Sequence, residues 1–408
     1  MKLVNIWNSV GKNIQILFLK TSIGGMGRSI FWLCSSFLLF GYTGSSKGYG
    51  DIAGFAMILG VLGPLLAGIM SDKYKRRDLF LWIGIALEAV SLWLIGTVKS
   101  LEVVILAFLL FNLATGFTIT STITILSMET QSKQKNQVFT LFYMIENIFY
   151  GIGNLIGYFV LSKTISISEL SILIQLSAIL LSIDFILSLF IKDRNKKNFG
   201  VEITKTNNFK QKINKMVSYR PIMITLSDWM VSLGAGLSVI FIPIFLHSHY
   251  EIPVDSISII SGFMIMTAAF SSKILANIAD KKGRIMVLIG GNGVLVLMSG
   301  LIVPYPPVLI AIIAIISSNS LLNALVPIID AALTDSIAKQ RSGRWIATKD
   351  VGITVLFGIG NLIGGRLIEL VDFWLPFALS ACMYLLGAMI LLIIKLPRYK
   401  PSIKATLS

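Results

Sequence analysis

At residues 68–77 the chain reads GIMSDKYKRR, a dense group of charges between two long apolar runs. A related stretch, ANIADKKGR, occupies residues 276–284. Each contains two small residues three positions apart, then an aspartate, then basic residues that end in arginine. The two aspartates, Asp72 and Asp280, are 208 positions apart (280 − 72), close to half of the 408 residues. This spacing predicts a protein built from two related halves.

The composition of the chain indicates a membrane protein. Hydrophobic residues make up 55% of it and charged residues only 13%, against about 25% charged residues in soluble domains. The apolar residues come in long blocks, and about 20 helical residues cross the roughly 30 Å core of a bilayer. The net charge of +15 lies mostly in short loops beside these blocks, which argues against a nucleic-acid partner.

Twelve apolar segments are long enough to cross the bilayer. They cover about residues 14–41, 50–71, 79–97, 101–127, 138–162, 168–191, 219–246, 256–279, 285–303, 308–333, 345–368 and 373–395. A backbone in lipid must satisfy its own hydrogen bonds, so these segments are expected to be helices. The strict alternation of polarity that marks a membrane β-barrel is not seen.

The basic residues of the loops predict the orientation, because lysine and arginine collect on the cytoplasmic side. They concentrate in the loops after every second segment and in the C-terminal tail. We therefore expect a multi-pass protein of the cell membrane with both termini in the cytoplasm. The predicted parts are an N-terminal six-helix bundle at 1–191, a cytoplasmic linker at 192–218 and a C-terminal six-helix bundle at 219–408.

Further repeats support two related halves. YGIGNLIG at residues 150–157, in the fifth segment, matches FGIGNLIG at 357–364 in the eleventh. GMG at 25–27 in the first segment matches GAG at 234–236 in the seventh. Equivalent positions are six helices apart. Because six is an even number, both halves have the same orientation in the membrane. The predicted fold is an all-α membrane protein of twelve helices, in two bundles related by a pseudo-two-fold axis along the membrane normal.

With these features the chain resembles the major facilitator superfamily of transporters over essentially its whole length. The loop pattern of that family is Gly-x-x-x-Asp-x-x-Gly-Arg-Arg or Lys. The matching positions are Gly68, Asp72, Arg76 and Arg77 in the first copy, and Asp280, Gly283 and Arg284 in the second. The first copy has lysine in place of the second glycine, and the second copy has alanine in place of the first.

The resemblance implies a cytoplasmic gate at these loops. In the family, the first aspartate faces the eleventh helix across the seam between the halves, and a loop arginine pairs with an acid at the end of the fourth helix. Glu129 stands at that place here, with Asp335 as its counterpart after the tenth segment. The implied role is a latch that stabilises the outward-facing state. Simple anchoring of the topology by positive charge is the alternative.

The glycines of the fifth segment have two interpretations. Proton antiporters of the family often carry Gly-Pro-x-x-Gly in the fifth helix, and this chain has Gly153 and Gly157 with Asn154 in place of proline. Glycines also allow helices to pack closely at the seam between halves.

An arginine lies deep in the first segment, and ionisable residues inside a membrane span are costly and point to function. Arg28 is about fourteen residues into the segment, near the middle of the membrane. The resemblance implies that the first, fourth, seventh and tenth helices line the central cavity. Arg28 then either binds an anionic group of the substrate or forms a structural ion pair with an acid such as Glu146 or Asp330.

Acidic residues within the spans are candidates for proton coupling. Carboxylates removed from water can exchange protons near neutral pH. Glu146 and Asp330 are the preferred candidates, with Asp228 next. The adjacent pair Lys349 and Asp350 is expected at the gate.

Other polar and charged residues in the spans carry weaker predictions. Glu88 and Asp184 are further acids in the third and sixth segments, and Lys20 is expected to extend to the inner interface. The remaining candidates for substrate contact are Trp32, Asn112, Thr115, Ser232, Asn319 and Asn323. Packing or a helix–helix hydrogen bond is the alternative for each.

These features predict a secondary transporter that moves a small organic solute by alternating access, with proton-coupled export as the preferred mode. We expect a monomer surrounded by membrane lipid. The alternatives are uptake or exchange of an organic anion recognised by Arg28, and a non-transporting membrane sensor on the same fold. No enzyme activity, cofactor or metal site is predicted, since the cysteines lie in apolar runs and no Walker-type loop is present.

Overall fold

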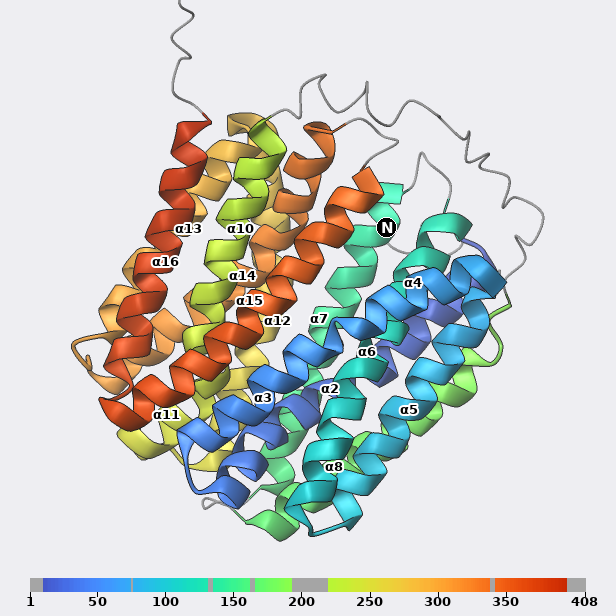
Figure 1. Cartoon of the computed structure of the whole chain (residues 1–408), viewed down its shortest axis with the longest axis horizontal. Coiled ribbons are helices and arrows are strands. Elements are labelled where there is room, and N and C mark those ends of the chain that lie inside the picture. Colours follow the sequence, from blue (N-terminus) through green and yellow to red (C-terminus); the bar gives the residue numbers. More distant parts are fainter. Residues whose placement is uncertain are drawn as a thin grey trace, which may run out of the picture.

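The computed structural model describes residues 10–74, 76–130, 135–161, 166–192, 219–337 and 342–394. Every regular element in this part of the chain is a helix (Figure 1). The first half contains α2 (Lys12–Thr43), α3 (Ser46–Gly60), α4 (Leu62–Tyr74), α5 (Arg77–Thr97), α6 (Leu101–Glu129), α7 (Lys135–Val160) and α8 (Ile167–Ser188). The second half contains α10 (Tyr219–Ser238), the 3-10 turn η1 (Val239–Phe241), α11 (Ile242–Tyr250), α12 (Val254–Lys282), α13 (Arg284–Ile302), α14 (Val308–Asp335), α15 (Ser342–Leu370) and α16 (Trp374–Ile393).

The helices confirm the twelve predicted spans. Eleven segments of the described chain are long and apolar enough to cross a membrane, and α7, which contains Glu146 and Asn154, is the remaining long helix. Several helices extend a few residues beyond the predicted span, as α2 does relative to 14–41, because helical hydrogen bonding continues into the polar ends. The linker predicted at 192–218 lies outside the described residues apart from residue 192, so the domain boundaries stay a prediction.

Two spans consist of consecutive helices. The second span is divided into α3 and α4 beside Pro64, and the seventh into α10, η1 and α11 beside Pro243. Proline lacks a backbone N–H and is accommodated in the first turn of a helix, where that donor has no partner within the helix. The two breaks therefore lie where proline starts a new helix.

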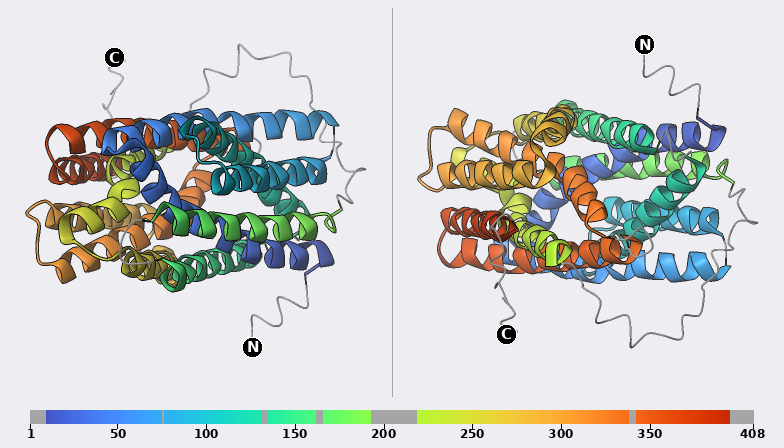
Figure 2. Two further views of the ribbon diagram at one scale, coloured as in Figure 1. Left: turned by 90° about the horizontal axis from the view of Figure 1, so that it is seen from below. Right: turned by 90° about the horizontal axis from the view of Figure 1, so that it is seen from above.

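Within each half, the helices pack in the same pattern. In the first half α2 contacts α7 and α8, α5 contacts α6 and α8, and α4 contacts α6. In the second half α10 contacts α15 and α16, α13 contacts α14 and α16, and α12 contacts α14. The two halves gather toward opposite ends of the long axis of the molecule in both views of Figure 2. The sequence repeat thus corresponds to a repeat in helix packing.

Two helix pairs form most of the seam between the halves. Helix α3 packs along α15, and α7 packs along α12. These pairs are equivalent under the repeat, because α3 and α12 belong to the second and eighth spans, and α7 and α15 are the fifth and eleventh. The seam therefore has the pseudo-two-fold relation that the sequence predicts.

The apolar core is shared at one end of the molecule and divided at the other. At the ends opposite the basic loops, one core contains residues of both halves, such as Phe37 and Phe245. The rings of Phe37 and His247 meet across the seam with centroids 6.1 Å apart, and Arg366 forms an ion pair of 2.9 Å with Asp51. At the ends that carry the basic loops, each half has a core of its own. The seam is therefore closed on the side opposite the basic loops.

The repeated glycines account for the close approach of helices in both halves. A Cβ on Gly151 would lie 2.9 Å from the backbone of Gly262 across the seam, and one on Gly358 would lie 2.8 Å from the backbone of Gly54. Gly153 faces the first helix of its own half instead, with a Cβ position 2.5 Å from the oxygen of Met26. These contacts support the interpretation of the glycines as packing residues.

We predict that Gly358→Ala destabilises the protein by about 1–3 kcal/mol, because the added methyl group overlaps the α3 backbone at the seam. Gly293→Ala is the matched control, since a Cβ there meets no atom within 4 Å. Thermal unfolding in detergent checks both variants. Equal unfolding temperatures for the two variants would contradict the close packing described for the seam.

Candidate functional site

Arg28 is held by two acids inside the first half. Its Nη2 and Nε donate to Oε2 of Glu88 on α5 at 2.7 and 2.9 Å, and Nη2 also donates to Oδ2 of Asp184 on α8 at 3.2 Å. Both carboxylates are fully buried and Arg28 is 6% exposed. Its partners are therefore neither Glu146 nor Asp330, the acids named from the sequence.

Asp184 reaches Arg28 through a notch in α2. The notch lies at Gly24, where an added Cβ would be within van der Waals overlap of the Asp184 carboxylate. Lys20, Gly24 and Arg28 are four residues apart and share one face of α2. Asp184 consequently lies between two cations, with Lys20 Nζ 3.7 Å from its Oδ1. Lys20 is 1% exposed, so the prediction that it extends to the inner interface was wrong.

Glu146 is a further acid near this ionic group. It lies on α7, is partly exposed, and is within electrostatic range of Arg28 and Lys20. The ionic group already contains two cations, Arg28 and Lys20, and two carboxylates, Glu88 and Asp184, so its charges balance. Glu146 therefore adds one carboxylate that this group of four does not neutralise.

A second ionic cluster lies in the other half. Lys349 on α15 forms ion pairs with Asp330 on α14, with Asp350 at 3.2 Å and with Asp228 on α10 at 3.8 Å. The Lys349 side chain is 3% exposed, whereas those of Asp330 and Asp350 are 40% and 59% exposed. The cluster has three carboxylates for one ammonium group and so carries excess negative charge.

The two ionic groups approach each other at the seam. Tyr143, one turn before Glu146 on α7, lies within electrostatic range of Glu146 and also of Asp330, Asp350 and Lys349 in the second half. Two of the proton-coupling candidates, Glu146 and Asp330, are thus both near this tyrosine although they belong to different halves.

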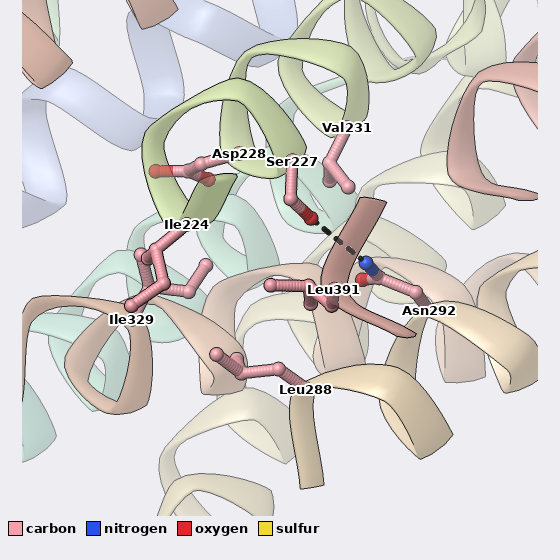
Figure 3. A pocket seen from close by; sticks show the side chains of 8 residues that line it. All are labelled: Ile224, Ser227, Asp228, Val231, Leu288, Asn292, Ile329 and Leu391. Atoms are coloured by element: carbon pink, nitrogen blue, oxygen red, sulfur yellow. Dashed lines mark hydrogen bonds between the residues drawn. The ribbon is translucent and has the colours of Figure 1, made fainter. Parts of the chain in front are cut away.

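Asp228 also borders a small internal cavity of the second half. The cavity, about 10 Å³, is lined by Ile224, Ser227, Asp228, Val231, Leu288, Asn292, Ile329 and Leu391 (Figure 3). Asn292 donates to Ser227 across it at 3.5 Å, and the Asp228 carboxylate points away from this pair. The volume is on the scale of one water molecule, so the cavity is too small for an organic solute.

The neutral polar candidates bond mainly within their own helices. Most donate to a carbonyl four residues earlier in their own helix: Asn112 to Phe108, Thr115 to Phe111, Ser232 to Asp228, Asn319 to Ile315 and Asn323 to Asn319. Trp32 packs against the rings of Phe31, Phe108 and Phe111. Each therefore has a local structural role, and substrate contact stays a prediction for all of them. Within the described ranges, no group of three or more His, Cys, Asp or Glu side chains is placed to hold a metal ion.

A comparison with protein families decides the class of the chain. The family model described as Major Facilitator Superfamily matches residues 17–318 and 224–407. The chain belongs to this superfamily. None of the curated proteins matches the sequence significantly.

Solved structures of similar fold include several transporters of this superfamily's type. A nucleoside transporter, NupG, has a TM-score of 0.71 at 15% identity, over 95% of this chain and 100% of the other. A POT family transporter bound to a thioalcohol-conjugated peptide has a TM-score of 0.75 at 12% identity, over 94% and 96%. A D-xylose–proton symporter has a TM-score of 0.74 at 11% identity, over 93% and 97%. At these identities the likeness concerns the fold alone.

The second copy of the superfamily loop forms its expected ion pair. Arg284, the first residue of α13, pairs with Asp335 at the end of α14 and also donates to the Ala331 oxygen at 3.1 Å. Gly283 has a φ of 87°, a conformation that favours glycine, between α12 and α13. Asp280 is exposed near the end of α12.

The first copy of the loop has different contacts. Arg76 pairs with Asp78 at 3.0 Å, and Arg77 contacts the Met128 sulfur. Glu129 accepts from Asn13 Nδ2 at 3.2 Å and has no loop arginine among its described contacts. Gly68 lies in α4 with open space beside its Cα. Asp72 also lies in α4, but its side chain is outside the described part of the structure.

Sequence reasoning missed three elements of this superfamily member's ionic groups. It named neither Glu88 nor Asp184 as partners of Arg28, and it did not predict the ion pairs of Lys349 with Asp228 and Asp330. The equal spacing of Lys20, Gly24 and Arg28 was the available signal, because it indicates one polar stripe along α2.

We predict that Glu88→Gln lowers the stability of this superfamily member by about 3–5 kcal/mol, since it leaves a buried guanidinium without full compensation. Glu102→Gln, at an exposed position in the first turn of α6, is the control and is expected to change stability little. Thermal unfolding in detergent measures both. Wild-type stability for Glu88→Gln would show that Arg28 does not depend on this pair.

Proposed function

We propose that the chain is a proton-coupled secondary transporter that exports a small organic solute by alternating access of its two halves. The observation that carries the proposal is the placement of Glu146. It is a partly exposed carboxylate on a seam helix, beside an ionic group that is neutral without it. A proton on Glu146 neutralises the charge that the surrounding residues leave uncompensated.

The division of the apolar core supports alternating access. The seam is closed at the outer ends by the shared core and by the Arg366–Asp51 pair. The ends that carry the basic loops have separate cores. With those loops in the cytoplasm, as their charge predicts, this arrangement corresponds to the inward-facing state.

The second half supplies further acids for the proposed proton coupling. Asp330 and Asp350 are partly exposed and lie near Tyr143 across the seam. Their excess over Lys349 favours a proton or a positively charged group at this position. Asp330 is therefore the second proposed proton-coupling residue, and Asp228 is the next candidate.

The pairing of Arg28 weighs against the anion alternative. A guanidinium that already contacts two buried carboxylates has little capacity to bind an anionic solute. The export direction rests on a weaker feature, the Gly153 and Gly157 spacing that resembles the antiporters of the superfamily. A sensor without transport is disfavoured because the seam combines close packing with ionisable groups inside the spans.

Proton movement in proteoliposomes tests the proposal. The purified protein is reconstituted with an internal pH dye, and organic cations, organic anions and neutral compounds are added in turn under an imposed proton gradient. We expect at least one compound to move protons, and Glu146→Gln and Asp330→Asn to reduce that flux to the level of empty liposomes. Glu102→Gln is the control and keeps the flux.

Two outcomes would overturn this proposal. Labelled compounds that cross without any proton movement would exclude proton coupling. A response to anions alone that Arg28→Ala abolishes would favour the organic-anion alternative.

A further inference from the structure

Lys20 is a buried cation with only distant partners. Its Nζ lies 3.4 Å from Thr122 Oγ1 on α6 and 3.7 Å from Asp184 Oδ1. Asp184 Oδ1 itself accepts no hydrogen bond in the described structure. Charge-assisted hydrogen bonds are normally about 2.7–2.9 Å long. Lys20 is therefore held loosely, whereas Arg28 is held tightly by Glu88 at 2.7 and 2.9 Å and lies 3.2 Å from Asp184.

Glu146 is the carboxylate that complements this cation. Its helix, α7, packs along α2, and the charged groups in electrostatic range of Glu146 in the described structure are Arg28 and Lys20. Arg28 is occupied by Glu88 and Asp184. Lys20 is thus the cation that is free to move toward Glu146.

We propose that Lys20 exchanges partners between Asp184 and Glu146 as Glu146 gains and loses its proton. This inference rests on the proposed role of Glu146 as a proton carrier. When Glu146 is protonated, Lys20 stays beside Asp184, as in the present structure. When Glu146 releases its proton to water, Lys20 pairs with the new carboxylate and leaves Asp184 to Arg28. Lys20 keeps its own proton throughout and acts as a positioning residue.

The exchange connects proton binding to helix packing. Asp184 enters α2 at Gly24, between Lys20 and Arg28, so the position of Lys20 determines how strongly α8 is held against α2. The charged groups around Lys20 are Asp184 on α8, Glu88 on α5, Glu146 on α7 and Arg28 on α2 itself. A change in the charge of Glu146 is therefore transmitted to three neighbouring helices.

Distance measurements between spin labels test this mechanism without a known substrate. Labels are placed at Ile69→Cys on α4 and Ile278→Cys on α12, two exposed positions near the ends that carry the basic loops. The exposed Cys382 is replaced by serine and the buried Cys34 is kept. The full-length protein in lipid nanodiscs is measured from about pH 5 to about pH 9, which brackets shifted carboxylate titrations. The midpoint of the change in distance reports the proton equilibrium.

Three variants distinguish a role in coupling from a role in folding. Lys20→Met removes a positive charge near Glu146 and is expected to move the midpoint up by roughly 1 pH unit. Asp184→Asn leaves Lys20 to Glu146 and is expected to move it down. Lys20→Arg keeps the charge and is expected to keep the wild-type midpoint. General damage to the fold would not give shifts of opposite sign.

The outcomes separate the inference from the proposed function. A wild-type pH response that persists in Glu146→Gln contradicts Glu146 as the carrier, and with it the exchange. A response that Glu146→Gln abolishes, but whose midpoint Lys20→Met leaves unchanged, contradicts the exchange alone. The control Lys273→Met, an exposed lysine on α12, is expected to leave the midpoint unchanged. An equal shift in this control would also overturn the role of Lys20.

Discussion

Compensation of buried charge in an apolar protein is the constraint on which this structure depends most. An unpaired guanidinium near the middle of a membrane would be very costly. Arg28 is accommodated because α5 and α8 each bring a buried carboxylate to α2, and because Gly24 leaves room for one of them. The relative positions of three helices in the first half are thus tied to one side chain.

The seam depends on a second constraint, the absence of side chains where backbones meet. Gly151 and Gly358 occupy equivalent positions and both face the opposite half, while Gly153 and Gly360 both face the first helix of their own half. Lipid chains are as apolar as leucine, so helices in a bilayer gain from close contact rather than from burial. A repeated glycine pattern therefore produces a repeated helix arrangement, which explains why the repeat is visible in the sequence.

The fold was predictable from sequence to a greater extent than the site. Apolar blocks and basic loops identify spans directly, since bilayer thickness and the distribution of charge act on each segment separately. The partners of Arg28 could not be identified in this way. They lie 60 and 156 positions away, and only the packing of α2, α5 and α8 brings them together. The sequence also could not show that Asn112 and Asn319 bond to carbonyls of their own helices.

The two halves share a fold but differ in the placement of charge. The match of GMG at 25–27 with GAG at 234–236 has an offset of 209 (234 − 25), so Lys20 and Arg28 of the first span correspond to Trp229 and Leu237 of the seventh, which are uncharged. The second half supplies its cation from α15 as Lys349 instead. The first half balances apart from Glu146, and the second has two acids in excess. Because the surplus acids of both halves lie near the same tyrosine of the seam, like charges meet there. A proton or cation bound between them would relieve this repulsion, as the proposed coupling requires.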